Sequence, residues 1–174
     1  MSELRNFNRL FRLDGKVALV TGGASSSPSA ITLTSKANEI NDAGSRGLGL
    51  HAATAFLLAG AKKVIITARK REGAQGIDQA VEKLNALPGI QGKAVGIAAN
   101  VAETDQIEKL VEDVRKEEDH IDILIANAGA TWGGPFEPSP DWATKKVLDL
   151  NVRGVFNLVR LYVVSVSLGS DLLC

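Results

Sequence analysis

Cysteine and histidine are nearly absent from this sequence of 174 residues. The one cysteine, Cys174, excludes a disulfide framework and a cysteine-ligated metal site within the chain. The two histidines, His51 and His120, are too far apart in the sequence to suggest a metal motif. We therefore expect no bound metal.

Neither an excess of one charge nor a long apolar run is present. Twenty basic and twenty acidic residues cancel, so nothing favours a nucleic acid or an anionic membrane as partner. The most apolar stretch, 161–174, is too short and too rich in serine to span a bilayer. Residues 1–6 lack the apolar core of a secretion signal. With 45% apolar residues, as is usual in globular proteins, the chain is expected to be cytoplasmic.

What the sequence does contain is a regular alternation of apolar runs and helical patterns from residue 16 onward. This alternation is typical of βαβ units on a parallel sheet. It predicts strands at 16–20, 63–67, 94–98 and 121–126, separated by amphipathic helices, with a long helix from about Asp141. Right-handed crossovers then give the strand order 3-2-1-4. The predicted fold class is α/β: residues 1–174 form a single incomplete domain, the N-terminal part of a doubly wound parallel sheet (Rossmann fold) whose later strands are missing.

A glycine-rich loop follows the first strand in two pieces. Thr21-Gly22-Gly23 ends the strand and Gly44-Ser45-Arg46-Gly47-Leu48-Gly49 opens the next helix, with an irregular, serine-containing segment, 24–43, between them. A dinucleotide pyrophosphate is bound by backbone N–H groups at the start of a helix, where side chains must be absent. Because the two pieces form one strand, turn and helix once the segment is removed, we predict a phosphate-binding turn that carries a loop insertion at 24–43.

Together with two later motifs, this loop resembles the short-chain dehydrogenases/reductases. The later motifs are Asn127-Ala128-Gly129 after the fourth strand and Asn151-Val152-Arg153-Gly154-Val155-Phe156 in the last helix. The resemblance covers about 13–23 and 44–161. Within the family, residues 129–134 and 142–152 look most like 3-oxoacyl-carrier-protein reductases of the rhamnolipid-synthesis type.

The resemblance implies roles for individual residues. The residues it places at the cofactor are Gly22, Gly23, Ser45, Arg46, Gly47, Leu48, Gly49, Arg69, Asn100, Val101, Asn127, Ala128 and Gly129. Asn100-Val101 stands where the family usually has Asp-Val facing the adenine, and an asparagine there keeps a carbonyl acceptor while adding an amide donor. Asn151 matches the asparagine of the family's catalytic Asn-Ser-Tyr-Lys tetrad.

The charges after the second strand bear on the choice of cofactor. A free 2′-hydroxyl of the ribose is usually bound by Asp or Glu at the end of that strand, whereas a 2′-phosphate needs a cation. The strand ends in Thr67-Ala68-Arg69-Lys70 without an acid, and Arg46 lies inside the glycine loop. Since guanidinium groups suit phosphate oxygens, these residues favour NADP over NAD. The alternative is that Arg69 and its neighbours form a solvated charge cluster.

One catalytic motif of the family is not found in the sequence. In relatives a Tyr-x-x-x-Lys pair serves proton transfer to the developing alkoxide, but the one tyrosine, Tyr162, is followed by Val-Val-Ser-Val. Ser165, Ser167 and Ser170 lie too close to Asn151 to match the family's catalytic serine. We therefore expect an NADP-dependent oxidoreductase by family, acting on a small carbonyl or alcohol substrate, whose present chain is inactive. The alternative is a catalytically dead protein that binds the cofactor or acts as a dimer decoy.

Two segments depart from the family pattern, the insertion at 24–43 and an atypical tail at 162–174. Both are explained if they are translated introns, which a comparison of transcript and gene would test. Because the insertion leaves from the place where the pyrophosphate must lie, we expect weak or absent cofactor binding. In relatives the helix from about Asp141 helps to form a subunit interface, which implies a homo-oligomer in the intact relative. Without the later strands this helix is expected to expose some combination of Val155, Phe156, Leu158 and Val159.

Overall fold

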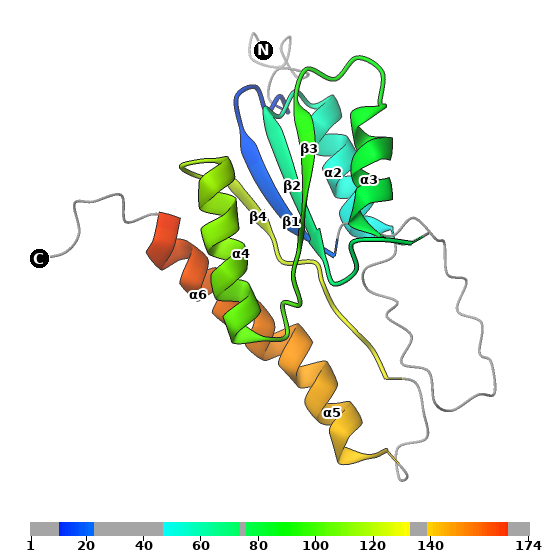
Figure 1. The fold of residues 1–174 in the computed structure, drawn as a ribbon, viewed down its shortest axis with the longest axis vertical. Coiled ribbons are helices and arrows are strands. Elements are labelled where there is room, and N and C mark those ends of the chain that lie inside the picture. Colours follow the sequence, from blue (N-terminus) through cyan, green and yellow to red (C-terminus); the bar gives the residue numbers. More distant parts are fainter. Residues whose placement is uncertain (1–10, 23–46, 74–75, 133–138, 167–174) are drawn as a thin grey trace, which may run out of the picture.

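The fold is a parallel sheet with helices on both faces (Figure 1). The computed structural model describes residues 11–22, 47–73, 76–132 and 139–166. The predicted insertion at 24–43 lies outside these ranges, as do three of the predicted cofactor residues, Gly23, Ser45 and Arg46.

Four parallel strands form the sheet in the order β3-β2-β1-β4. They are β1 (Val17–Thr21), β2 (Lys63–Ala68), β3 (Lys93–Ala98) and β4 (Ile123–Ile125). This confirms the order 3-2-1-4 that the sequence predicts, although β4 is shorter than the apolar run 121–126. Leu19 in β1 is paired with Ile65 of β2 and with Leu124 of β4, and every residue of β1 is buried. A strand that is covered on both faces is expected to be a continuous apolar run, as β1 is.

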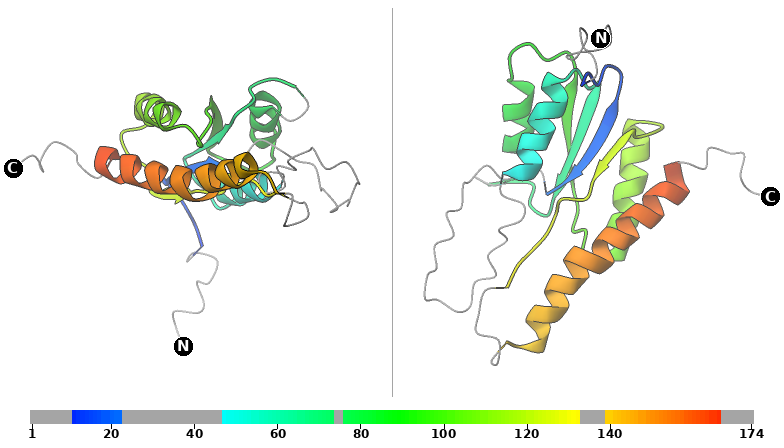
Figure 2. Two further views of the ribbon diagram at one scale, coloured as in Figure 1. Left: turned by 90° about the horizontal axis from the view of Figure 1, so that it is seen from below. Right: turned by 180° about the vertical axis from the view of Figure 1, so that it is seen from behind.

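The helices α2 (Leu48–Leu58) and α3 (Ile77–Asn85) cover one face of the sheet (Figure 2). Successive side chains of a strand point to opposite faces, so alternate strand residues pack against these helices. The buried residues on this face are Ala18, Val20, Val64, Ile66 and Ala94 from the strands and Ala53, Leu57, Ile77, Ala80 and Leu84 from the helices. A Cβ at Gly96 would lie 2.0 Å from Cγ2 of Ile77, so the glycine in β3 allows α3 to approach the sheet closely.

The opposite face is covered by α4 (Thr104–Glu117) and by a long helix that consists of α5 (Asp141–Leu148), the π-helical segment η2 (Asp149–Gly154) and α6 (Val155–Val166). The buried residues on this face include Leu19, Ile65, Ile107, Leu110, Val111, Val114, Leu158 and Tyr162. The i, i+3, i+4, i+7 stripe of α4 therefore faces the core, as its spacing predicts.

The long helix continues to Val166, so Tyr162 to Val166 are helical although the sequence assigns them to the atypical tail. Their β-branched character is outweighed by tertiary packing, because Tyr162 and Leu158 bury their side chains against α4. Residues 167–174 lie outside the described part of the chain.

An apolar stripe runs along the solvent side of the long helix. Its members are Leu148, Val152, Phe156, Val159 and Val163, which are between 42% and 67% exposed. Of the residues that the sequence suggests could be exposed, Phe156 and Val159 belong to this stripe, whereas Leu158 is buried. Among the described helices, none is both long and apolar enough to cross a membrane.

Ion pairs hold the amino end of the sheet. Lys63, at the start of β2, is 5% exposed; its Nζ lies 2.9 Å from Oε1 of Glu118 and donates to the backbone oxygen of Glu117 at 2.8 Å. Lys62 pairs with the other oxygen of Glu118 at 2.8 Å. Burial by itself lowers the pKa of Lys63, but the carboxylates of Glu118 and Glu117 outweigh it and raise the pKa above its ordinary value. Lys63 therefore stays charged and fastens the end of α4 to β2.

Candidate functional site

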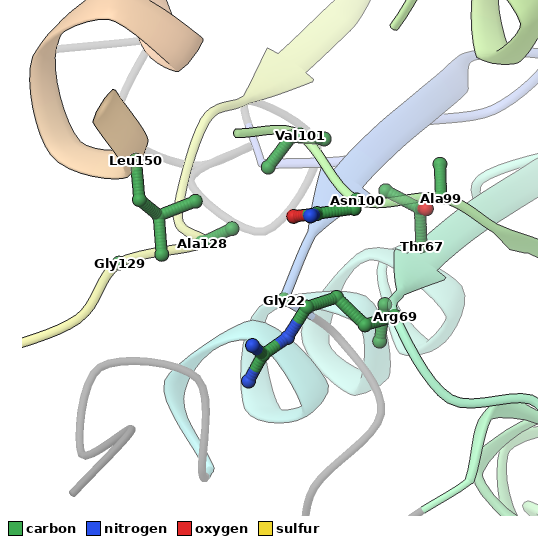
Figure 3. A pocket seen from close by; sticks show the side chains of 10 residues that line it. Gly22, Thr67, Arg69, Ala99, Asn100, Val101, Ala128, Gly129 and Leu150 are labelled. Atoms are coloured by element: carbon green, nitrogen blue, oxygen red, sulfur yellow. The ribbon is translucent and has the colours of Figure 1, made fainter. Parts of the chain in front are cut away.

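A pocket lies at the carboxyl ends of the strands, where open α/β sheets bind their ligands. It is lined by Gly22, Thr67, Ala68, Arg69, Ala99, Asn100, Val101, Ala128, Gly129 and Leu150 (Figure 3). Six of these residues were predicted at the cofactor from sequence. They come from the ends of all four strands, and parallel pairing with the order β3-β2-β1-β4 brings those ends together.

The two pieces of the glycine loop meet at the end of β1. A Cβ at Gly49 would lie 2.7 Å from the carbonyl oxygen of Gly22 and 2.8 Å from Nδ2 of Asn127. Gly22 has a φ of 74°, in the left-handed region that favours glycine, and a Cβ there would lie 3.0 Å from Cα of Ala128. The start of α2 therefore lies directly against the end of β1 without room for side chains, even though segment 24–43 separates them in the sequence.

At the start of α2, backbone atoms and not side chains face the end of β1. Gly47 precedes the helix with a φ of 126°, and its carbonyl accepts the first helical bond, from the N–H of His51 at 2.8 Å. Leu48 is 75% exposed, so its side chain does not fill the space beside the loop. The first N–H groups of a helix have no partner within the helix and carry its positive dipole end, which suits a phosphate.

The motif Asn127-Ala128-Gly129 ties the ends of neighbouring strands together. Nδ2 of Asn127 donates to the backbone oxygen of Thr21 at 3.0 Å, and the N–H of Ala128 donates to Oγ1 of the same threonine at 3.0 Å. The N–H of Gly22 donates to the backbone oxygen of Thr67 at 2.7 Å, which links β1 to β2. The sequence names Thr21 only as part of the glycine-loop motif and gives its hydroxyl no role; the one signal is a hydroxyl at the end of an otherwise apolar strand.

Asn151 lies in the π-helical segment η2 and is engaged with the backbone of the next loop. Its Oδ1 accepts from the N–H of Ala130 at 2.8 Å, and its Nδ2 donates to the oxygen of the same residue at 2.7 Å. A Cβ at Gly129 would lie 3.2 Å from that Oδ1, which allows the loop to pass close to the helix. π-Helical segments are frequent at functional sites. In this geometry the Asn151 side chain positions the loop that leaves β4.

Arg69 and Asn100 stand side by side at the ends of β2 and β3. In Figure 3 the Arg69 side chain extends from the end of β2 across the mouth of the pocket, and Asn100 points from the end of β3 toward Ala128 and Gly129. The two strands are joined at this point by a bond from the N–H of Ala99 to the oxygen of Ala68 at 3.0 Å. A cation and an amide are thus held at neighbouring positions of one pocket.

A second hollow adjoins the first on the side of α5. It shares Arg69, Asn100 and Leu150 with the first and adds Ala102, Glu103, Trp142, Lys145, Lys146 and Asp149. Trp142 and Trp132 stack edge to face with ring centroids 5.0 Å apart, so the loop that leaves β4 packs through Trp132 against the first turn of α5.

Thr67 and Leu150 line the pocket but were not found from the sequence. Thr67 is 1% exposed, and among the described residues its Oγ1 is one of three buried side-chain polar atoms without a hydrogen-bond partner. Its only signal was a polar residue in an apolar strand. Leu150 precedes Asn151 in the long helix, and only the packing of that helix against the sheet brings it to the pocket.

Tyr162 lies in the apolar core and is not among the residues that line the pocket. It is 6% exposed within the core cluster between α6 and α4, and its hydroxyl has no hydrogen-bond partner among the described residues. Burial raises its pKa well above the ordinary value, and the charge of Asp122 raises it further. A tyrosine that acts as a general acid needs the opposite, a pKa tuned toward the working pH. Within the described residues no cluster of His, Cys, Asp and Glu could hold a metal ion.

Comparison with known proteins agrees with this geometry. A family profile described as short chain dehydrogenase matches residues 42–167, more than half of the chain. The chain is 31% identical over 150 residues to a short-chain dehydrogenase/reductase of Pestalotiopsis microspora and, again over 150 residues, to the rhamnolipids biosynthesis 3-oxoacyl-[acyl-carrier-protein] reductase of Pseudomonas aeruginosa. These alignments cover 86% of this chain but 46% and 47% of the relatives, so the chain spans less than half the length of these two relatives.

Solved structures give the same result. The Pseudomonas aeruginosa RhlG/NADP active-site complex is similar with a TM-score of 0.67 and 29% identity, over 89% of this chain and 49% of that one. A short-chain type dehydrogenase/reductase from Mycobacterium marinum is similar with a TM-score of 0.68 and 25% identity, over 90% of this chain and 52% of that one. The protein therefore belongs to the short-chain dehydrogenases/reductases, a family of oxidoreductases.

Proposed function

We propose that the pocket at the carboxyl ends of the strands binds NADP(H), and that the chain is the cofactor-binding part of an oxidoreductase for a small carbonyl or alcohol substrate. The observation that carries the proposal is the close contact between Gly22 and Gly49. This contact leaves backbone alone where a pyrophosphate would meet the start of α2. The NADP complex of a relative that is 29% identical supports the choice of cofactor.

The remaining parts of the cofactor have matching residues around the pocket. Arg69, at the end of β2, offers a guanidinium to a 2′-phosphate, and the strand end Thr67-Ala68-Arg69-Lys70 contains no acid to bind a free 2′-hydroxyl. Asn100 and Val101 border the place of the base, and Ala128 and Gly129 the place of the ribose. Thr67 adds a buried hydroxyl that lacks a partner among the described residues.

The chemistry divides between the cofactor and the protein. When bound, NADP(H) supplies or accepts the hydride. The chain binds and orients it and, through Asn151, positions the loop that leaves β4. The sequence contains one tyrosine, and its buried hydroxyl is not available to a substrate. We therefore expect this chain alone to bind cofactor weakly and not to turn over a carbonyl substrate.

Cofactor binding is tested by the quenching of NADPH fluorescence or by ligand-observed NMR at up to millimolar nucleotide. Arg69→Ser is expected to weaken NADP⁺ binding about tenfold or more, since a charge-assisted hydrogen bond contributes about 1.5–3 kcal/mol. NAD⁺ binding should change little. Arg160→Ser, which removes an exposed arginine of α6 that does not line the pocket, is the matched control. If Arg69→Ser weakened NAD⁺ and NADP⁺ equally, Arg69 would not read the 2′-phosphate; if neither nucleotide bound the unmodified chain, the proposed function would be wrong.

The apolar stripe favours a second function, association with another copy of this helix, as a dimer decoy requires. Val152 and Phe156 are 59% and 67% exposed at its centre, and exposed apolar patches of this kind mark interaction sites. Sedimentation of the unmodified chain should show a dimer, and Val152→Ser/Phe156→Ser a monomer. Leu58→Ser, at an equally exposed leucine of α2, is the control. A chain that stays monomeric at all concentrations would contradict this function.

A further inference from the structure

The second hollow, between the β3–α4 turn and α5, is roomier than the pocket at the strand ends. Its volume is about 280 Å³, whereas that of the first pocket is about 40 Å³. Small-molecule sites usually measure about 300–1,000 Å³, so the second hollow lies near the lower end of this range. The proposed NADP site leaves this space unused, because the residues that we assign to the base, the ribose and the 2′-phosphate all line the first pocket.

Arg153 ties the two walls of the second hollow together. Ala102 lies on the wall formed by the β3–α4 turn, and Asp149 on the wall formed by the long helix. Nη2 of Arg153 donates to the backbone oxygen of Ala102 at 3.0 Å, and its Nε is paired with Oδ1 of Asp149 at 3.1 Å. Nζ of Lys145 pairs with the other oxygen of Asp149 at 2.5 Å. These contacts hold the walls at their present separation, so a ligand would enter a preformed space.

Trp142 gives the second hollow an aromatic wall. It is 53% exposed, and its ring is held by the edge-to-face contact with Trp132. Aromatic rings attract each other in offset-stacked and edge-to-face arrangements, so a planar ring that enters the hollow has a partner in Trp142. Water in contact with the exposed indole would be displaced by such a ring, which adds a hydrophobic contribution. The hollow therefore suits a flat, aromatic ligand.

The charges around the second hollow favour an anion. Three cationic side chains line it, against two carboxylates: Arg69, Lys145 and Lys146 against Glu103 and Asp149. Asp149 is already paired with Lys145. Lys146 has no ion pair within the part of the chain that the structure describes, so its ammonium is available to a ligand. The remaining carboxylate, Glu103, lies on the turn, across the hollow from Lys146. Charge-assisted hydrogen bonds to an ammonium are strong ones, and a carboxylate group is well suited to form them.

We propose that the second hollow binds a small aromatic carboxylate, with its ring against Trp142 and its carboxylate at Lys146. The inference goes beyond the proposed NADP site and does not depend on it, because Trp142 and Lys146 line the second hollow and not the first pocket. Arg69 borders both spaces and extends across the mouth of the first (Figure 3). Its guanidinium therefore adds to the positive potential that an anion meets in the second hollow.

The test measures the Kd of two probes on the full chain by ligand-observed NMR, with no nucleotide present. The probes are naphthoate and its neutral amide, naphthamide, which have the same ring system. Naphthoate should bind about threefold or more tightly than naphthamide at low salt, and the difference should shrink as salt is added, because a partly exposed ion pair is screened. The ring protons of both probes should shift upfield on binding, as protons stacked on an indole do.

Four variants locate the two contacts. Lys146→Met keeps most of the apolar stem and removes the charge, so it should raise the Kd of naphthoate about threefold to fivefold and leave naphthamide unchanged. Lys109→Met, at an exposed lysine of α4 that does not line the hollow, is the matched control and should change neither Kd. Trp142→Leu should weaken both probes about fivefold, because the stacking partner is lost. Glu103→Gln should tighten naphthoate alone.

Three results would overturn the inference. They are no binding of either probe at millimolar concentration, equal binding of naphthoate and naphthamide, and an equal effect of Lys146→Met and Lys109→Met, which would mean that naphthoate responds only to the net charge of the chain. Should Trp142→Leu not fold, the exposed Lys146 decides through its own variant. Because no nucleotide is present, these results leave the proposed NADP site standing. A chain that binds naphthoate as expected but no NADP⁺ would support the hollow and contradict the cofactor site.

Discussion

Replacing Tyr162 with phenylalanine should make the protein more stable. The ring is 6% exposed among the apolar residues between α6 and α4, and its hydroxyl has no hydrogen-bond partner among the described residues. A buried polar group left without a partner costs about 1–3 kcal/mol, whereas the ring contacts are the same in phenylalanine. We therefore expect the free energy of unfolding to rise by about 1–2 kcal/mol. In a chain of this size, each kcal/mol raises Tm by about 2–4 °C.

The same substitution should change the response to alkaline pH. Burial raises the pKa of Tyr162 above its ordinary value of 10.0, and the charge of Asp122 adds to the shift. Since the unfolded chain releases this proton first, ionisation of Tyr162 leaves the free energy of unfolding unchanged below about pH 10 and lowers it as the pH rises above that value. The unmodified protein should lose up to about 1.4 kcal/mol more per pH unit than Tyr162→Phe between about pH 10 and 12.

Urea unfolding followed by circular dichroism at pH 7 and again at several alkaline pH values measures both effects. Thr54→Val is a suitable comparison, because its hydroxyl has a partner, the backbone oxygen of Leu50 at 2.9 Å. Removing that hydroxyl should give no stabilisation and no change in the alkaline slope. A lower stability of Tyr162→Phe at pH 7 would show that the hydroxyl is bonded in the folded protein and would refute the reasoning.

Two further substitutions test the packing of the split loop and the amino end of the sheet. Gly49→Ala places a Cβ 2.7 Å from a backbone oxygen of Gly22. The resulting overpacking costs about 1–3 kcal/mol, which should exceed the gain in helix propensity of roughly 1 kcal/mol. A Tm equal to or above that of the unmodified chain would contradict the contact. Lys63→Met removes the ammonium from Glu117 and Glu118. Because Lys62 still pairs with Glu118, the free energy of unfolding measured in urea should fall by about 1–3 kcal/mol, which is less than the cost of breaking a fully buried pair.

Much of the candidate cofactor site follows from local sequence alone. The strand ends, the glycines at 22, 47 and 49 and the motif at 127–129 are local patterns. A parallel sheet brings the ends of its strands to one edge whatever its side chains do. Arg69 and Asn100 could be placed in the same pocket on that basis, and the structure has them there. Their proposed contacts with a nucleotide remain predictions.

Contacts between distant segments could not be read in this way. Thr21 receives the N–H of Ala128, and Leu150 reaches the pocket, only because β4 and the long helix pack where they do. Likewise, the sequence sets 162–174 apart as an atypical tail, but the long helix continues to Val166, with Tyr162 buried against α4. Such contacts depend on the summed packing of elements far apart in the sequence, which no local pattern encodes.

The sequence by itself determined the order of the strands, the position of the glycine loop and the types of residue at the site, because these depend on local periodicity and on the handedness of βαβ units. Tertiary structure alone decided how those residues are used. It brought Gly49 against Gly22 across the segment 24–43, and it buried the one tyrosine in the core. It also turned the side-chain oxygen of Asn100 to the N–H of Ala102. The physical reason is that a hydrogen-bonding group is defined by the partner it finds in space, and that partner is set by the fold.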